Sequence, residues 1–246
     1  MARKILTPNQ RLIVAADFPL VKDDPSSPIA KLKRLCQQIT LSQAAVKVNS
    51  LQRREGQGLI DVIHSYGLSA FADLKLIDIG GTMMIDGQYL REVRPEFLTV
   101  MCHAGVKNMR RLKEMLPDTE ILGVTVLTDQ TEEDVQRVNR CSIEEAVRTY
   151  ALMAKEAGID GLIASPSEAK MLRELVGDDI TINTPAIRPI RLEVANDDQN
   201  LQRAKTPQGA FEAGADRIIV GRPITQAENS QLAIAHTLEE IAECFA

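Results

Sequence analysis

The stretch from residue 69 to residue 78 reads Ser-Ala-Phe-Ala-Asp-Leu-Lys-Leu-Ile-Asp, an apolar run that gains charges toward its carboxyl end. In a strand, Asp73 and Lys75 are two residues apart and point to one face, with Leu74 on the other. Short runs of nearly continuous hydrophobicity are typical of parallel strands that are covered on both faces. The stretch therefore predicts a buried parallel strand with charged side chains near its end.

Similar runs rich in Val, Ile or Leu recur along the chain, with amphipathic helical patterns between them. The predicted strands are Leu12–Ala16, Ala44–Val48, Ser69–Leu74, Phe97–Cys102, Ile121–Leu127, Gly161–Ala164, Ile180–Asn183 and Arg217–Val220, and examples of the predicted helices are Ile29–Ile39, Leu51–His64, Ile143–Ala157 and Gln226–Cys244. Eight strands that alternate with helices favour a closed (β/α)8 TIM barrel. An open doubly wound sheet is the alternative, but no Gly-x-Gly-x-x-Gly follows the first strand. Because no linker or convincing repeat interrupts the pattern, we expect residues 1–246 to form a single α/β domain.

The composition excludes several classes of partner. The net charge is −5, aromatic residues make up 3% of the chain and no Lys/Arg-rich run is present, so we expect no nucleic-acid partner. The four cysteines show no Cys-x-x-Cys spacing, and with three histidines they form no zinc-ligand pattern. The apolar stretch near the start is broken by Asn9, Gln10 and Arg11, and no run is long enough to span a membrane. We expect a soluble, cytoplasmic protein with reduced thiols and no membrane partner.

Charged residues interrupt the predicted strands where a barrel would open. Asp17 closes the first strand run and Lys47 interrupts the second, while Asp73, Lys75 and Asp78 occupy and follow the third. Inward charge in a barrel is tolerated mainly near the mouth, where catalytic groups gather. Unpaired burial costs several kcal/mol per charge, so these groups must neutralise one another. Asp73 and Lys75 alone fit a structural ion pair as well as a catalytic one. Adding Lys47 and Asp78 gives two cations and two anions, and this balanced set favours an active site.

A second cluster fits a phosphate site. The segment Arg217-Ile-Ile-Val-Gly-Arg-Pro-Ile-Thr runs from the last predicted strand into a helix. Gly221 permits close approach of the backbone, Pro223 suits a first helical turn, and the start of a helix offers free amide groups. Arg222 adds a guanidinium group that binds phosphate through two hydrogen bonds. The alternative is an arginine on a surface loop.

The connection Thr184–Thr206 is polar, contains prolines and is much longer than the other connections. Long connections in compact domains are usually lids or binding loops, and the alternative is a tolerated insertion.

Several motifs resemble the orotidine 5′-phosphate decarboxylase family. Asp73-Leu-Lys75-Leu-Ile-Asp78, followed by Thr82, is similar to the Asp-x-Lys-x-x-Asp signature of that family. The other matching segments, in order, are Ile13-Val-Ala-Ala-Asp17-Phe-Pro, Lys47, Gly123-Val-Thr-Val-Leu-Thr, Thr184-Pro-Ala-Ile-Arg-Pro189, Thr206-Pro, Ala213-Gly-Ala-Asp and Gly221-Arg-Pro-Ile-Thr225. The Asp-x-Lys-x-x-Asp motif alone is moderately specific for this family. Its combination with Thr184-Pro-Ala-Ile-Arg-Pro189 and Gly221-Arg-Pro-Ile-Thr225 makes the resemblance strong.

The resemblance implies a homodimer with shared active sites that converts orotidine 5′-phosphate to UMP and CO2 in pyrimidine biosynthesis, without metal or cofactor. It implies that Asp73 lies beside the substrate carboxylate, that Lys75 protonates C6 of the pyrimidine and that Asp78 enters the neighbouring subunit's site. It implies catalytic roles for Lys47, Asp73, Lys75 and Asp78, and substrate-binding roles for Asp17, Thr82, Arg188, Gln199, Gln202, Gly221 and Arg222. Gln199 and Gln202 are alternatives for one phosphate contact.

Departures from the family pattern leave two other readings open. Gly80 and Gly81 stand where the family has Pro-Asn, and Ala186 and Asn49 stand where it has glycine. Ala-Asp-x-Lys-x-x-Asp-x-Gly is also similar to Mg²⁺-dependent hexulose-phosphate synthases and ketogulonate-phosphate decarboxylases, which share the barrel. Those relatives lack the Thr-Pro-Ala-Ile-Arg-Pro and Gly-Arg-Pro-Ile-Thr motifs of this chain. The third reading is a non-catalytic, nucleotide-binding barrel.

Overall fold

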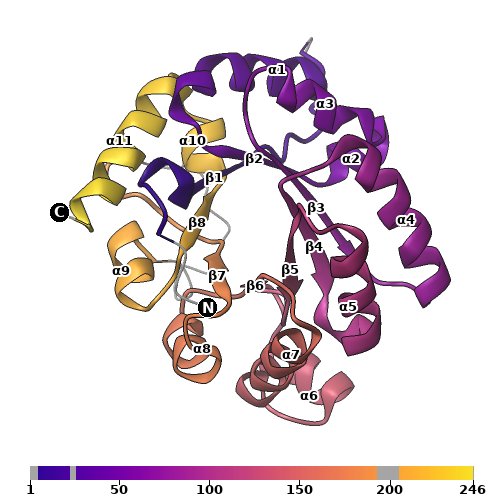
Figure 1. Cartoon of the computed structure of the whole chain (residues 1–246). Helices are drawn as coiled ribbons and strands as arrows, with labels where there is room; N and C mark the ends of the chain where they lie inside the picture. The colour runs from indigo at the N-terminus through magenta and orange to yellow at the C-terminus, as the bar shows by residue number, and fades with distance from the viewer. Residues whose placement is uncertain (1–4, 23–25, 193–204, 246) are drawn as a thin grey trace.

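The computed structural model of the chain describes residues 5–22, 26–192 and 205–245. Eight parallel strands follow one another around a closed barrel, in which β8 pairs with β1 (Figure 1). They are β1 (Leu12–Ala15), β2 (Ala45–Val48), β3 (Ala70–Leu76), β4 (Phe97–Met101), β5 (Glu120–Val124), β6 (Gly161–Ile163), β7 (Thr181–Thr184) and β8 (Arg217–Val220). The predicted single-domain (β/α)8 barrel is confirmed, and every predicted strand overlaps an observed one.

Helices surround the barrel on the outside (Figure 1). Among the described residues they are α1 (Pro28–Ile39), α2 (Ser50–Glu55), α3 (Gly58–His64), α4 (Gly80–Val93), α5 (Val106–Met115), α6 (Glu132–Asn139), α7 (Ile143–Ala157), α8 (Ala169–Val176), α9 (Pro207–Glu212), α10 (Arg222–Thr225) and α11 (Ser230–Glu243), with the short 3-10 helices η1 (Asn9–Arg11), η2 (Thr40–Ser42) and η3 (Cys102–Ala104). None of the helices in the described part of the chain has the length and apolar character needed to cross a membrane.

Two predicted helices were wrong in their limits. The pattern Leu51–His64 forms two helices, because Gly56 has a φ of 85° and ends α2. The pattern Gln226–Cys244 begins too early. The side chain of Asn229 accepts a hydrogen bond from the backbone of Leu232 and caps α11, which starts at Ser230. The helix after β8 is the single turn α10, so the free amide groups expected after Gly221 belong to a very short helix.

The strand side chains divide the core in two, as alternation requires. One set packs between the barrel and the helices, and the other fills the barrel interior. The interior set consists of Ile13, Ala15, Ala45, Phe71, Phe97, Leu122 and Ile219. The interior becomes polar toward the carboxyl ends of the strands, where Lys47, Asp73 and Thr99 are buried.

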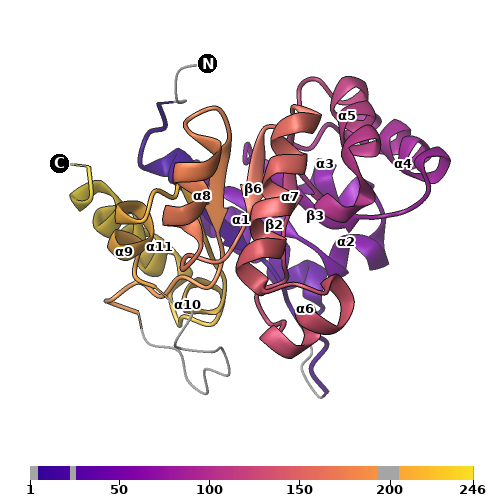
Figure 2. The same cartoon turned by 90° about the horizontal axis from the view of Figure 1, so that it is seen from below.

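A buried ion pair occupies the opposite end of the barrel. The Arg217 guanidinium lies 3.0 Å from the Glu120 carboxylate, donates to Asn183 at 3.2 Å and stacks over the ring of Phe97. Arg217 and Glu120 therefore neutralise each other's charge inside the barrel, and Asn183 accepts a hydrogen bond from the guanidinium. The polar groups Lys47, Asp73 and Thr99 lie instead toward the carboxyl ends of the strands. Figure 2 shows α6 and α10 at that end of the barrel.

The structure shows the local effect of two departures from the pattern that the sequence resembles, Gly80 and Ala186. A Cβ atom on Gly80 would come within 2.7 Å of Asn108 Oδ1, and one on Gly87 within 2.7 Å of Met115 Sδ, so both glycines allow α4 to approach α5 closely. Ala186 has a φ of 62°, a left-handed conformation that strains residues with a Cβ atom. The family's glycine at that position fits the same backbone without this strain.

Candidate functional site

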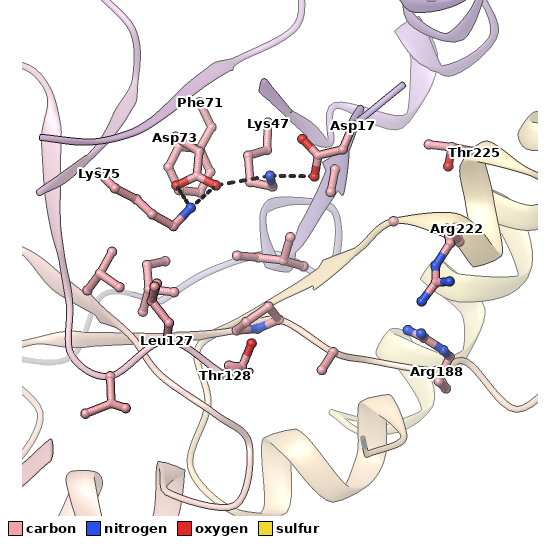
Figure 3. A pocket seen from close by; sticks show the side chains of 18 residues that line it. Asp17, Lys47, Phe71, Asp73, Lys75, Leu127, Thr128, Arg188, Arg222 and Thr225 are labelled. Carbon is pink, nitrogen blue, oxygen red and sulfur yellow. Dashed lines mark hydrogen bonds and ion pairs between the residues drawn. The ribbon is translucent and has the colours of Figure 1, made fainter. Parts of the chain in front are cut away.

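A cavity of about 490 Å³ opens among the carboxyl ends of the strands. Its lining is apolar at its base and charged toward both sides (Figure 3). The lining residues are Ala15, Asp17, Lys47, Phe71, Asp73, Lys75, Val124, Val126, Leu127, Thr128, Ile163, Pro185, Ala186, Arg188, Ile219, Gly221, Arg222 and Thr225. The volume is in the usual range for a small-molecule site, and active sites of such barrels lie at this end.

One side of the cavity carries a continuous chain of opposite charges. The Lys47 ammonium donates to Asp17 Oδ2 at 2.8 Å and to Asp73 Oδ2 at 3.1 Å. The Lys75 ammonium donates to both oxygens of Asp73 at 2.8 Å (Figure 3). The amide of Asn49 adds a contact of 3.3 Å to Asp73 Oδ2. The alternating order Asp17, Lys47, Asp73, Lys75 joins β2 and β3 to the segment that follows β1 in one network.

Burial makes this network electrostatically strong. Asp73 is 6% exposed and Lys47 7% exposed. Burial alone would raise the pKa of Asp73, but the nearby Lys47 and Lys75 ammonium groups and the hydrogen bonds from Lys75 and Thr99 lower it to about 2. Burial would lower the pKa of Lys47, and the Asp73 and Asp17 carboxylates outweigh burial and raise it. Both groups are therefore charged at neutral pH.

An irregularity in β3 brings Lys75 onto Asp73. Ala72 pairs with Leu98 of β4 and Leu76 pairs with Val100, so the three residues between them lie opposite Thr99 alone. Within this bulge Lys75 has a φ of 49°, in the left-handed region. The prediction that Asp73 and Lys75 face one side is correct, but the bulge rather than regular alternation produces the contact.

The other side of the cavity carries two arginines. Arg188 follows β7 and Arg222 begins α10, and Figure 3 shows their guanidinium groups pointing toward each other. Thr225 lies at the same end, next to Arg222 (Figure 3). Gly221 also lines the cavity. A Cβ atom on Gly221 would lie 3.6 Å from Ala15 Cβ, an ordinary contact, so packing within the described chain does not require the glycine. Two guanidinium groups that point toward each other are suited to bind an anion such as a phosphate group.

Asp78 and Thr82 are absent from the described residues that line this cavity. Asp78 is exposed, and its carboxylate accepts a hydrogen bond from the backbone of Ile79. Large apolar side chains of the same segment and of α4 are also exposed: Ile77, Ile79, Ile85 and Tyr89. The structure thus leaves Asp78 and Thr82 outside the cavity of their own chain. Gln199 and Gln202 lie outside the described residues.

The sequence analysis missed several residues of the site. Thr99 contacts Asp73 and Lys75, and Phe71, Leu127 and Thr128 line the cavity. The available signal for Thr99 was a hydroxyl two residues after Phe97 in an otherwise apolar strand, which places both side chains on the inward face. Among the described residues, no three side chains of His, Cys, Asp or Glu are grouped as potential metal ligands.

The closed barrel and the charged cavity at its carboxyl end define the class, a (β/α)8 barrel with an enzyme-type site. A model of the orotidine 5′-phosphate decarboxylase / HUMPS family matches residues 10–236. The orotidine 5′-phosphate decarboxylase of Rhodopseudomonas palustris (strain BisA53) is 37% identical over 234 residues, 94% of each chain. That of Thermobifida fusca (strain YX) is 36% identical, over 93% of this chain and 97% of its own. The crystal structure of orotidine 5′-phosphate decarboxylase from Lactobacillus acidophilus superposes with a TM-score of 0.76 at 30% identity, covering 94% of this chain and 99% of that one. The chain belongs to the orotidine 5′-phosphate decarboxylase / HUMPS family.

The low pKa of Asp73 predicts a specific acid sensitivity. Because the folded-state pKa is about 2, against an ordinary value of 3.8, the network stabilises the fold above about pH 4 and loses this contribution as the pH falls toward 2. The contribution is on the order of 2 kcal/mol. In urea unfolding at a series of pH values, Asp73→Asn should flatten the loss of stability across this window. The exposed Asp61→Asn serves as control, and an unchanged slope in Asp73→Asn would contradict the assignment.

Proposed function

We propose that this chain is a cofactor-independent decarboxylase that converts orotidine 5′-phosphate to UMP and CO2 in pyrimidine biosynthesis. The observation that carries the proposal is the buried Asp73 carboxylate, which accepts hydrogen bonds from two ammonium groups. Two arginines lie at the opposite side of the same cavity. The family and the full-length similarity to enzymes of that name support the same substrate.

The two charged sides of the cavity match the two ends of the nucleotide. Arg188 and Arg222 bind the phosphate through charge-assisted hydrogen bonds. Asp17 and Lys47, which border the Asp73 side, bind the ribose hydroxyls. The pyrimidine then lies over the apolar wall, with its carboxylate toward Asp73 and its C6 toward Lys75. Phosphate binding far from the reacting bond supplies energy for holding the substrate carboxylate in an unfavourable place.

The chemistry follows from the charges. Two carboxylates about 4 Å apart at an effective dielectric constant of 20 repel each other by roughly 4 kcal/mol. Breaking the bond from C6 to the carboxyl carbon releases neutral CO2, relieves this repulsion and leaves the electron pair on C6. The Lys75 ammonium, already held at Asp73, stabilises that carbanion and transfers a proton to it. Lys75 regains its proton from water, which completes the balance.

The arrangement of Asp73 favours this reaction over a magnesium-dependent one. Its Oδ1 accepts from Lys75 and Thr99, and its Oδ2 accepts from Lys47, Lys75 and Asn49. A carboxylate surrounded by two ammonium groups is already neutralised and is poorly suited to bind a divalent cation. We therefore assign the chain to metal-independent decarboxylation.

We further propose a cytoplasmic homodimer with shared active sites. Asp78 is exposed beside the apolar side chains of Ile77 and Ile79, and Tyr89 of α4 is exposed as well. Covering this apolar surface with a second copy would bring Asp78 and Thr82 toward the partner's cavity, and C2 symmetry would make the exchange reciprocal. All four cysteines are free thiols, in keeping with a reducing compartment.

Turnover tests the reaction class directly. Purified protein should consume orotidine 5′-phosphate with release of CO2, followed by ultraviolet absorbance, and EDTA should leave the rate unchanged because no step uses a metal. Activity on a hexulose phosphate that EDTA abolishes, without activity on the nucleotide, would assign the chain to the magnesium-dependent relatives. Tight UMP binding without turnover of either substrate would indicate a non-catalytic barrel.

Subunit mixing tests the shared site. Lys75→Ala and Asp78→Asn homodimers should each be nearly inactive, because every site lacks one essential group. A mixed dimer has one doubly altered site and one intact site. Random exchange makes half of the dimers mixed, so roughly a quarter of the wild-type activity should return. Native mass spectrometry verifies that exchange has occurred. If exchanged samples remain inactive, Asp78 acts within its own subunit.

A further inference from the structure

The strongest unassigned feature of the site is the side chain of Thr99. It lies on β4, points into the barrel and is 0% exposed. Thr99 is not among the residues that line the cavity, so its hydroxyl does not reach the space that a substrate would occupy. Its contacts are instead with Asp73 and Lys75, two residues that we assign to the reaction.

One hydroxyl group makes two different hydrogen bonds. Thr99 Oγ1 donates its proton to Asp73 Oδ1 at 2.8 Å and accepts the backbone N–H of Lys75 at 2.8 Å. A hydroxyl has one donor and two acceptor positions, so both bonds form simultaneously, and the charged carboxylate determines the direction of the proton. Thr99 thereby links the side chain of the carboxylate to the main chain of the lysine.

The bulge of β3 gives this link its importance. The residues from Asp73 to Lys75 lie opposite Thr99 alone, so the hydroxyl accepts a backbone hydrogen bond in place of a regular ladder acceptor. Lys75 has a φ of 49°, a conformation that persists in a residue with a Cβ atom only when its surroundings hold it. The guanidinium of Arg53 supports the same bulge by donating to the carbonyl of Leu74 at 2.9 Å.

We propose that Thr99 is a positioning residue, which holds the Asp73 carboxylate and the Lys75 backbone in the relative placement that the reaction needs. It acts through these two residues and touches neither substrate nor product. The inference rests on the proposed decarboxylase function for its kinetic consequences, whereas the two hydrogen bonds are independent of that function. The hydroxyl, rather than the methyl group or the volume of the side chain, carries the role.

The test compares Thr99→Val, which keeps the shape and removes the hydroxyl, with Thr99→Ser, which keeps the hydroxyl. Loss of a hydrogen bond to a charged group should lower kcat for orotidine 5′-phosphate by about 10- to 100-fold in Thr99→Val. KM and the Kd of UMP should change by less than about threefold, because the substrate contacts remain. Thr99→Ser should keep kcat within about threefold of wild type.

Thr237→Val is the matched control. Thr237 is also fully buried, but its hydroxyl donates to Ala233 within α11. This variant should keep wild-type kcat and show the thermal destabilisation that a buried Thr→Val change causes anywhere in the barrel. If Thr99→Val does not fold, Thr99→Ala replaces it in the comparison with Thr99→Ser. Wild-type kcat in Thr99→Val, or equal losses in Thr99→Val and Thr99→Ser, would overturn the proposal.

Acid unfolding separates a failure of this inference from a failure of the proposed function. Removing the Thr99 hydroxyl removes one cause of the low pKa of Asp73, so the free energy of unfolding of Thr99→Val should fall less than that of wild type as the pH is lowered from about 4 to 2. Thr99→Ser and Thr237→Val should lose as much free energy of unfolding over this pH range as wild type does, although Thr237→Val is less stable at every pH. The measurement holds even if the wild-type protein does not act on orotidine 5′-phosphate. A loss of free energy of unfolding between about pH 4 and 2 in Thr99→Val equal to that in Thr237→Val would contradict the positioning role.

Discussion

The carboxylate of Asp73, buried between the ammonium groups of Lys47 and Lys75, is the interaction on which the rest of the site depends. A lone buried carboxylate would cost several kcal/mol and would take up a proton to avoid the cost. Two lysines and a threonine hydroxyl keep it charged instead. The barrel can bury this charge only near its mouth, where three neighbouring strands deliver the compensating groups. The position of the network in the fold is therefore an electrostatic necessity as well as a functional one.

The same constraint shapes the rest of the cavity. The network is balanced while the cavity is empty, and a substrate carboxylate adds a negative charge beside Asp73. Binding energy must then come from elsewhere, and the converging guanidinium groups of Arg188 and Arg222 lie at the opposite end. This division of charge suits a nucleotide, whose phosphate is remote from the bond that breaks. A protein of net charge −5 holds such an anion through local cations rather than through its overall field.

The fold was predictable because the strands are almost continuously apolar. The position of the site was predictable because charged residues are rare within such apolar runs. Lys47, Asp73 and Lys75 were identified in this way, and the structure brings them together. Thr99 escaped prediction because threonine is common in strands and its role arises from a bulge, which depends on pairing between β3 and β4. The role that we propose for Asp78 requires a second chain, and no pattern within one sequence can place a second chain. Ala186 was recognised as a departure, and its φ of 62° gives the physical reason why glycine suits that position.

We propose that the Lys75 ammonium is in place before the reaction begins and stabilises the negative charge that develops at C6 as the bond to the carboxyl carbon breaks. By microscopic reversibility, the site should also promote loss of the C6 proton from the product. The decisive measurement is exchange of the C6 hydrogen of UMP with D2O, followed by loss of its proton NMR signal in the presence of the protein. Wild-type protein should catalyse this exchange, and Lys75→Ala should not, although it still binds UMP through the phosphate end. If wild-type protein that binds UMP exchanges this hydrogen no faster than buffer does, the network around Lys75 does not stabilise the carbanion at C6.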